Sequence, residues 1–116
     1  MTGLMMLLST VMLESAADAP HCQENLIFPP QEKHVHSSSI VQCPNGDLLA
    51  CWLYGSGERQ SPDVVVQGAR LKKGAAAWSP IFPMADTPHF PDCNPVLFVD
   101  ANQQLWLFWI AVLAER

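Results

Sequence analysis

Two segments of this 116-residue chain repeat one pattern, and the repeat limits the fold more than any other feature. The segment SSIVQCPNGDLLACW ends at Trp52, and the segment PVLFVDANQQLWLFW ends at Trp109. The separation of these two Trp residues along the chain is here called the repeat interval. When the segments are aligned, the apolar positions, the turn residues and the terminal Trp coincide. Each copy has two short apolar runs around a polar turn, which predicts a β-hairpin in each copy.

The first copy shows why the prediction is a hairpin of buried strands. Residues 38–42 and 48–54 are separated by Pro-Asn-Gly-Asp, and Asn and Gly tolerate the positive φ that tight turns need. Both alternating sets of side chains in residues 48–54 are apolar, which indicates a strand covered on both faces. A further strand is expected over residues 63–71, before a Lys-Lys-Gly turn that leads to Trp78.

A repeat of this length suits one antiparallel four-stranded sheet per unit, as in a blade of a β-propeller. A β-sandwich is the structural alternative. We therefore predict an all-β fold that is a fragment of a six-bladed β-propeller, with about one blade and the opening hairpin of the next. Trp52, Trp106 and Trp109 are expected in the core between blades. Because repeat units bury their faces against neighbours, the chain is expected to be a truncated piece of a longer repeat protein.

The N-terminal region divides into two predicted segments before this domain. Residues 1–19 combine an apolar run with the small residues Ser15 and Ala17, which predicts a signal peptide and a secreted or periplasmic protein; a buried helix is the alternative. The apolar run is too short for a helix that spans a membrane, and no other segment qualifies as a membrane span. Residues 20–35 contain a double proline and are expected to be an extended lead-in, so that the partial propeller covers residues 36–116.

Charge and cysteine content exclude several kinds of partner and site. The formal charge is −5, with 6 basic and 11 acidic residues, so no basic surface for nucleic acid is expected. An anion would need a local Arg, Lys or backbone site. The four cysteines allow two disulfides in an exported chain, although Cys43 and Cys51 also fit as small buried residues. No Cys-x-x-Cys motif occurs, and His34 and His36 lack a third ligand at metal-site spacing, so no metal or other cofactor is predicted.

Five segments together resemble a known family: HSSSIVQCPNGDLLACW, GSGERQSPD, VVVQGARL, AAAWS and NPVLFVDANQQLWLFW. They are similar to the first third of sialidase (neuraminidase)-like six-bladed propellers with Asp-box repeats, from about residue 34 onward. In that family an arginine triad holds the sialic acid carboxylate, an Asp is the acid/base, and a Tyr activated by a Glu is the nucleophile. The Asp box itself is reduced here to Trp78, with Lys73 in the place of its Asp.

The resemblance assigns roles to residues of this chain. Asp63 matches the acid/base Asp in the loop after the first hairpin, and Glu58 and Arg59 of that loop are candidates for substrate binding. His36 stands where the family has its first triad Arg and is also a candidate for substrate binding. A neutral imidazole, however, cannot form the bidentate contact that Arg makes with a carboxylate. Asp92 occupies the matching rim of the second repeat and is a further candidate for substrate binding, or a turn residue.

The resulting expectation is the N-terminal part of an exported sialidase-like glycoside hydrolase acting on acidic-sugar glycoconjugates. Its partner is a carbohydrate or glycoconjugate ligand. The alternatives are a non-catalytic carbohydrate-binding or scaffold propeller, and an inactive truncated fragment. Asp63 as a general acid would need a raised pKa, which a neighbouring Glu58 could provide.

Overall fold

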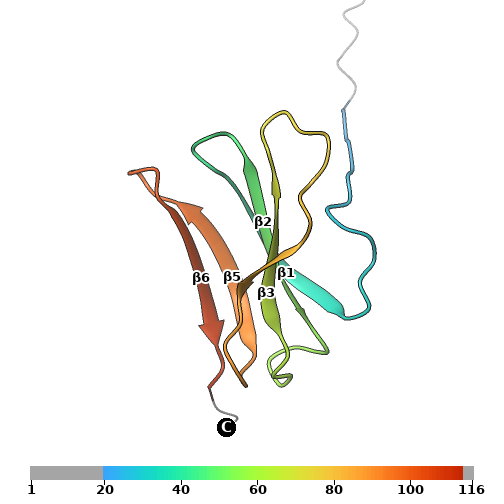
Figure 1. Ribbon diagram of the computed structural model, residues 1–116, viewed down its shortest axis with the longest axis vertical. Coiled ribbons are helices and arrows are strands. Elements are labelled where there is room, and N and C mark those ends of the chain that lie inside the picture. Colours follow the sequence, from blue (N-terminus) through green and yellow to red (C-terminus); the bar gives the residue numbers. More distant parts are fainter. Residues whose placement is uncertain (1–19, 114–116) are drawn as a thin grey trace, which may run out of the picture.

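A computed structural model describes residues 20–113 of the chain, so the predicted signal peptide at residues 1–19 lies outside the described residues. These residues form six strands and no helix, which confirms the all-β prediction. The strands are β1 His34–Gln42, β2 Leu48–Gly55, β3 Val65–Leu71, β4 Phe82–Ala85, β5 Asp92–Val99 and β6 Leu105–Ala111. They make two antiparallel sheets, one in the order β1-β2-β3-β4 and one of β5 and β6 (Figure 1).

The predicted hairpin of the first repeat is present as β1 and β2. Its turn closes with a hydrogen bond from Cys43 N to Asp47 O of 2.7 Å, and Gly46 has a φ of 88°. Strand β1 begins at His34, inside the segment predicted as lead-in, and that boundary was therefore placed too late. Strand β4 was not predicted, because it has only four residues and contains Pro83; Pro is tolerated there since β4 is an edge strand.

The sequence repeat is visible in the backbone itself. Gln42 pairs with Leu48 in the first hairpin, and Val99 pairs with Leu105 in the second, and the same repeat interval relates the other pairs along both ladders. The turns also correspond, since Asp100 N donates to Gln104 O over 3.0 Å where Cys43 N donates to Asp47 O. Gln103, the counterpart of Gly46, likewise has a positive φ, of 65°. The two hairpins are therefore structural copies.

Each copy also has a β-bulge at the same place. The register of the first hairpin shifts between His36 and Ser39, and that of the second shifts between Cys93 and Val96. Within each bulge one residue has a positive φ: Ser37 at 54° and its counterpart Asn94 at 48°. A bulge adds one unpaired residue and reverses the alternation of faces beyond it.

The main core lies between the two sheets. The β5–β6 hairpin packs against β1 and β2, at the left of the four-stranded sheet in Figure 1. Leu97 from β5 is buried against the first sheet, and Leu107 from β6 packs against the same core. Ser39 Oγ accepts a hydrogen bond from Leu97 N over 3.0 Å. The buried members of this inter-sheet core are Cys43, Leu49, Cys51, Leu53, Val64, Val66 and Leu97. Cys43 and Cys51 are thus buried as the sequence suggested, and all four cysteines are free rather than paired in disulfides.

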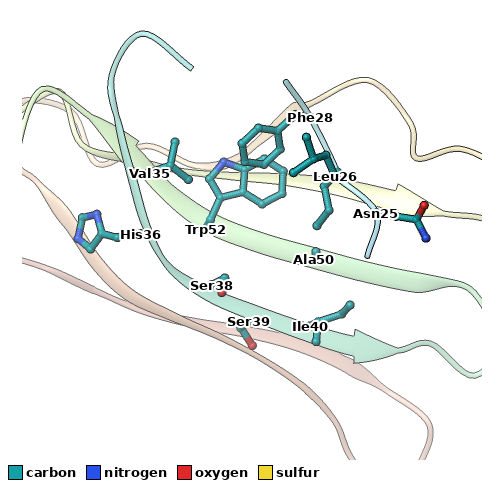
Figure 2. A pocket seen from close by; sticks show the side chains of 11 residues that line it. Asn25, Leu26, Phe28, Val35, His36, Ser38, Ser39, Ile40, Ala50 and Trp52 are labelled. Atoms are coloured by element: carbon teal, nitrogen blue, oxygen red, sulfur yellow. The ribbon is translucent and has the colours of Figure 1, made fainter. Parts of the chain in front are cut away.

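The lead-in covers the opposite face of the first sheet. Ile27 and Phe28 pack on a cluster formed by Ala50, Trp52 and Ala69, and the rings of Phe28 and Trp52 lie 4.5 Å apart between centroids (Figure 2). Strand β2 is therefore covered on both faces, as its apolar pattern predicted. The cover on this side comes from the extended lead-in of the same chain.

The outward face of the second hairpin has no cover among the described residues. Val96 and Phe98 on β5 and Trp106, Phe108 and Ile110 on β6 are each 41% to 55% exposed. On the inward face, Trp109 is also 42% exposed. The prediction that Trp106 and Trp109 lie in a core is therefore wrong for the part of the fold that the structure describes, whereas Trp52 is buried as expected.

Candidate functional site

Loops from both sheets meet at one end of the molecule, here called the rim. The β2–β3 loop, the segment before β5 and the residues after β6 all lie there, at the lower end of Figure 1. Val64 O accepts a hydrogen bond from Asp92 N over 3.0 Å, and Pro91 O accepts one from Val112 N over 3.0 Å. These two bonds join the first sheet to the start of β5 and the start of β5 to the end of β6. The loops are therefore held on a rigid base.

The rim contains an open recess of about 330 Å³. This volume is near the lower limit for small-molecule sites, about 300 Å³. Its lining combines a cationic, an imidazole and an aromatic side chain with prolines and amides. The lining residues, here called the rim recess, are Arg59, Gln60, Pro62, His89, Phe90, Pro91, Val112 and Leu113.

Arg59 is the charged group of the rim recess. Its side chain is exposed, and it forms no ion pair with any carboxylate in residues 20–113, Glu58 included. Two backbone hydrogen bonds shape the loop, from Ser61 N to Glu58 O and from Val64 N to Ser61 O. A guanidinium that forms no ion pair and lines the same recess as an aromatic ring is suited to bind a carboxylate or another anion.

Three predicted site residues lie close enough to influence one buried thiol. Burial raises the pKa of Cys93, the positive charge of Arg59 opposes the rise, and the charges of Asp92 and Glu58 add to it. The charges of Glu58, Arg59 and Asp92 therefore all act on the Cys93 thiol at the rim.

Asp92 lies behind the rim recess, with its side chain fully enclosed. Thr87 N donates to Asp92 Oδ2 over 3.1 Å, Thr87 Oγ1 donates to Oδ1 over 2.6 Å, and Trp109 Nε1 donates to Oδ1 over 3.1 Å. These bonds join the segment before β5 to β6. Asp92 supports the wall of the recess, and neither of its carboxylate oxygens is exposed. In this structure a substrate in the recess therefore cannot contact Asp92 as the sequence predicted.

Asp63 sits outside the rim recess in a network of donors. Lys33 Nζ lies 2.8 Å from its Oδ2, Ser56 Oγ donates to its Oδ1 over 2.6 Å, and Ser56 N also donates to the carboxylate. Lys33 and, after it, Ser56 hold the pKa of Asp63 far below its usual range. A general acid must carry a proton, so these surroundings oppose the acid role, and Glu58 is not the neighbour that sets this pKa.

His36 lies on a different surface from the other predicted site residues. Its ring stacks on His34, with centroids 4.4 Å apart, and its Nδ1 is buried without a partner among the described residues. It lines a second, apolar recess of about 480 Å³ between the lead-in and the first sheet (Figure 2). Residues 20–113 contain no cluster of three His, Cys, Asp or Glu side chains that could hold a metal ion.

Sequence reasoning missed four residues that shape these sites. Lys33 and Ser56 set the state of Asp63, and His89 and Phe90 line the rim recess. Phe90 is the counterpart of Lys33, one repeat interval later, so extending the repeat backwards would have pointed to the rim segment of the second unit. The donors to Asp63 had no comparable signal, because Lys33 is 30 residues away in the chain.

No protein-family model, curated protein or solved structure matches this chain. The part of the chain that the structure describes has no helix both long enough and apolar enough to cross a bilayer. Function is therefore inferred from the site alone.

Proposed function

We propose that this chain is the N-terminal part of a sialidase-like β-propeller whose rim recess binds the acidic sugars of glycoconjugates. The observation that carries the proposal is that Arg59, which pairs with no carboxylate of residues 20–113, lines the rim recess together with Phe90. Sugar rings pack on aromatic faces, and a guanidinium gives a carboxylate two parallel hydrogen bonds. In a chain of net charge −5, such a local cation is needed to hold an anion.

The four-stranded sheet packed against a copied hairpin supports the propeller part of this proposal. Propeller blades are four-stranded antiparallel sheets that pack face to face, and the repeat here has that sheet and that type of contact. Loops at one end of such blades form the ligand site, and the rim loops of this chain lie together at one end.

Binding is proposed ahead of hydrolysis because of Asp63. The sialidase-like hydrolase remains the alternative, and it requires Asp63 to donate a proton to the departing glycosidic oxygen. Lys33 and Ser56 stabilise the ionised carboxylate instead. A hydrolase built on this chain would have to break the Lys33–Asp63 pair when substrate binds.

The binding proposal is tested by titrating the chain with a carboxylated monosaccharide glycoside and with its uncharged methyl ester. We expect tighter binding of the acid, and Arg59→Ala should weaken that binding by roughly 10- to 100-fold, the value of a charge-assisted hydrogen bond. Lys72→Ala, which removes an exposed charge from the far turn, should change nothing and is the matched control. Equal affinity for acid and ester would contradict the proposal.

Hydrolysis is tested with activated and unactivated glycosides of the same sugar. If Asp63 were the acid, Asp63→Ala would slow cleavage of the unactivated glycoside by roughly 10²- to 10⁴-fold and spare the activated one. If the unaltered chain cleaves neither glycoside, the hydrolase alternative is excluded for this chain and only the binding function remains.

We also propose that residues 1–19 direct export. Expression in a secreting host should give a mature protein that begins near Asp18 or Pro20, as determined by N-terminal sequencing. A mature product that retains Met1 would contradict export.

A further inference from the structure

The repeat relates the exposed face of the second hairpin to a buried face of the first sheet. The apolar residues on the outward side of β5 and β6, here called the outer face, are Val96, Phe98, Trp106, Phe108 and Ile110. Their counterparts one repeat interval earlier are Ser39, Val41, Leu49, Cys51 and Leu53. Of these, Val41, Leu49, Cys51 and Leu53 belong to the inter-sheet core, and Ser39 bonds to β5. The outer face is therefore the copy of a surface that the second hairpin covers in the first unit.

The surface of the second hairpin that faces the first sheet also has a counterpart in the first hairpin. The second hairpin contacts the first sheet through β5, whose Leu97 is buried in the inter-sheet core, and Leu107, paired with Leu97, packs against the same core. Their counterparts in the first hairpin are Ile40 and Ala50, which lie on the lead-in side of the first sheet with Trp52. This surface, here called the inner face, lines the 480 Å³ recess, and Ile40 is 58% exposed (Figure 2).

We infer that the outer face of one chain docks on the inner face of a second copy of the same chain. The contact would repeat the internal one between the two sheets, so the stack already formed inside one chain would continue into the next. The outer face has no charged residue, and its Phe98, Trp106 and Phe108 are larger than their buried counterparts Val41, Leu49 and Cys51. Large rings on the outer face match a recess that is open on the inner face.

The lead-in covers part of the inner face and so limits how much of it a second chain can contact. Ile40 is accessible as the structure stands, whereas Trp52 lies under Phe28. Full contact therefore requires the lead-in to leave Trp52. Because the two faces differ, the association is head to tail, and such an association closes into a ring or grows into a filament.

Two single variants of the full chain give a sharp test. Phe108→Glu places a charge on the outer face and leaves the inner face unchanged. Ile40→Glu places a charge on the inner face and leaves the outer face unchanged. Each should weaken self-association at least about 100-fold in sedimentation equilibrium, because an unpaired charge would be buried. Ala76→Glu adds the same charge to an exposed loop and should leave association unchanged.

Mixing the two variants distinguishes this mode from a symmetric dimer. The Ile40→Glu chain offers an intact outer face and the Phe108→Glu chain an intact inner face, so the mixture should form a one-to-one dimer that grows no further. A symmetric dimer through the outer face alone would give no such dimer, and that result would overturn the inference. An unaltered chain that is monomeric up to millimolar concentration would overturn it as well. Trp106→Glu repeats the outer-face arm if Phe108→Glu fails to fold.

Discussion

Leu53 and Ile110 offer an internal comparison of what a neighbouring sheet contributes to stability. They occupy equivalent positions in β2 and β6, opposite His36 and Cys93 respectively, and their side chains are isomers. Leu53 is 2% exposed beneath the second hairpin, and Ile110 is 54% exposed on the outer face. Truncating both to Ala removes the same number of carbon atoms from the same place in the repeat, so the difference isolates burial.

The magnitudes follow from these exposures. Leu53→Ala removes a buried side chain and leaves a cavity, which should lower the free energy of unfolding by about 2–5 kcal/mol. Full burial of an Ile side chain is worth about 1.5–3 kcal/mol, and Ile110 has only about half of that burial, so Ile110→Ala should cost about 1 kcal/mol. Water fills the space that Ile110 leaves, and no cavity forms.

Urea unfolding followed by circular dichroism measures both costs. The protein must be dilute enough to be monomeric, since docking of a second copy would bury Ile110 and raise its cost at higher concentration. If Leu53→Ala unfolds the chain, Leu53→Val and Ile110→Val provide the same comparison at smaller cost. Equal costs for the two sites in the dilute monomer would refute the packing of the second hairpin on the first sheet.

Three further outcomes are expected. Gln103→Gly should raise stability by roughly 0.5–1 kcal/mol in thermal unfolding, because Gly adopts a positive φ of 65° without strain; no gain would count against that turn. The lowered pKa of Asp63 contributes stability that is complete above about pH 4 and is lost as the pH falls toward its folded value, so Asp63→Asn should reduce the loss of stability between pH 7 and pH 3 in urea titrations. Native protein should react rapidly with a thiol reagent at the exposed Cys22 and slowly at Cys51, whose pKa burial raises; equal rates would show that the core opens.

Much of the fold was predictable because the hairpin signals are local. The Asn-Gly turn and the flanking apolar runs identify β1 and β2, and the repeat interval carries the same prediction to β5 and β6. The start of β1 was missed for a physical reason. The bulge at Ser37 reverses which side chains face the core, so the alternation before it does not continue the alternation after it.

The sequence indicated where the candidate site residues lie better than it indicated what each carboxylate does there. The sequence placed Arg59 in the loop after the first hairpin and Asp92 before the second hairpin, and in the structure these two segments lie at the same end of the molecule, joined by the hydrogen bond from Asp92 N to Val64 O. The burial of Asp92 depends on Thr87 and Trp109, and the ionised state of Asp63 depends on Lys33, a contact between distant segments. Such long-range partners set whether a carboxylate is a ligand, an acid or a support, and the residue's own neighbours in the chain do not indicate them.

The position of Phe28 on Trp52 gives the protein a built-in optical reporter. Trp52 is enclosed in apolar surroundings with its Nε1 unpartnered among the described residues, so it should emit at short wavelength and resist quenching by acrylamide. Trp106 and Trp109 are exposed and should emit at long wavelength and quench readily. Trp78 is partly buried against the same cluster and also contributes to the emission. Departure of the lead-in would shift the emission of Trp52 to longer wavelength while the sheets stay intact, so opening of this segment can be followed separately from unfolding.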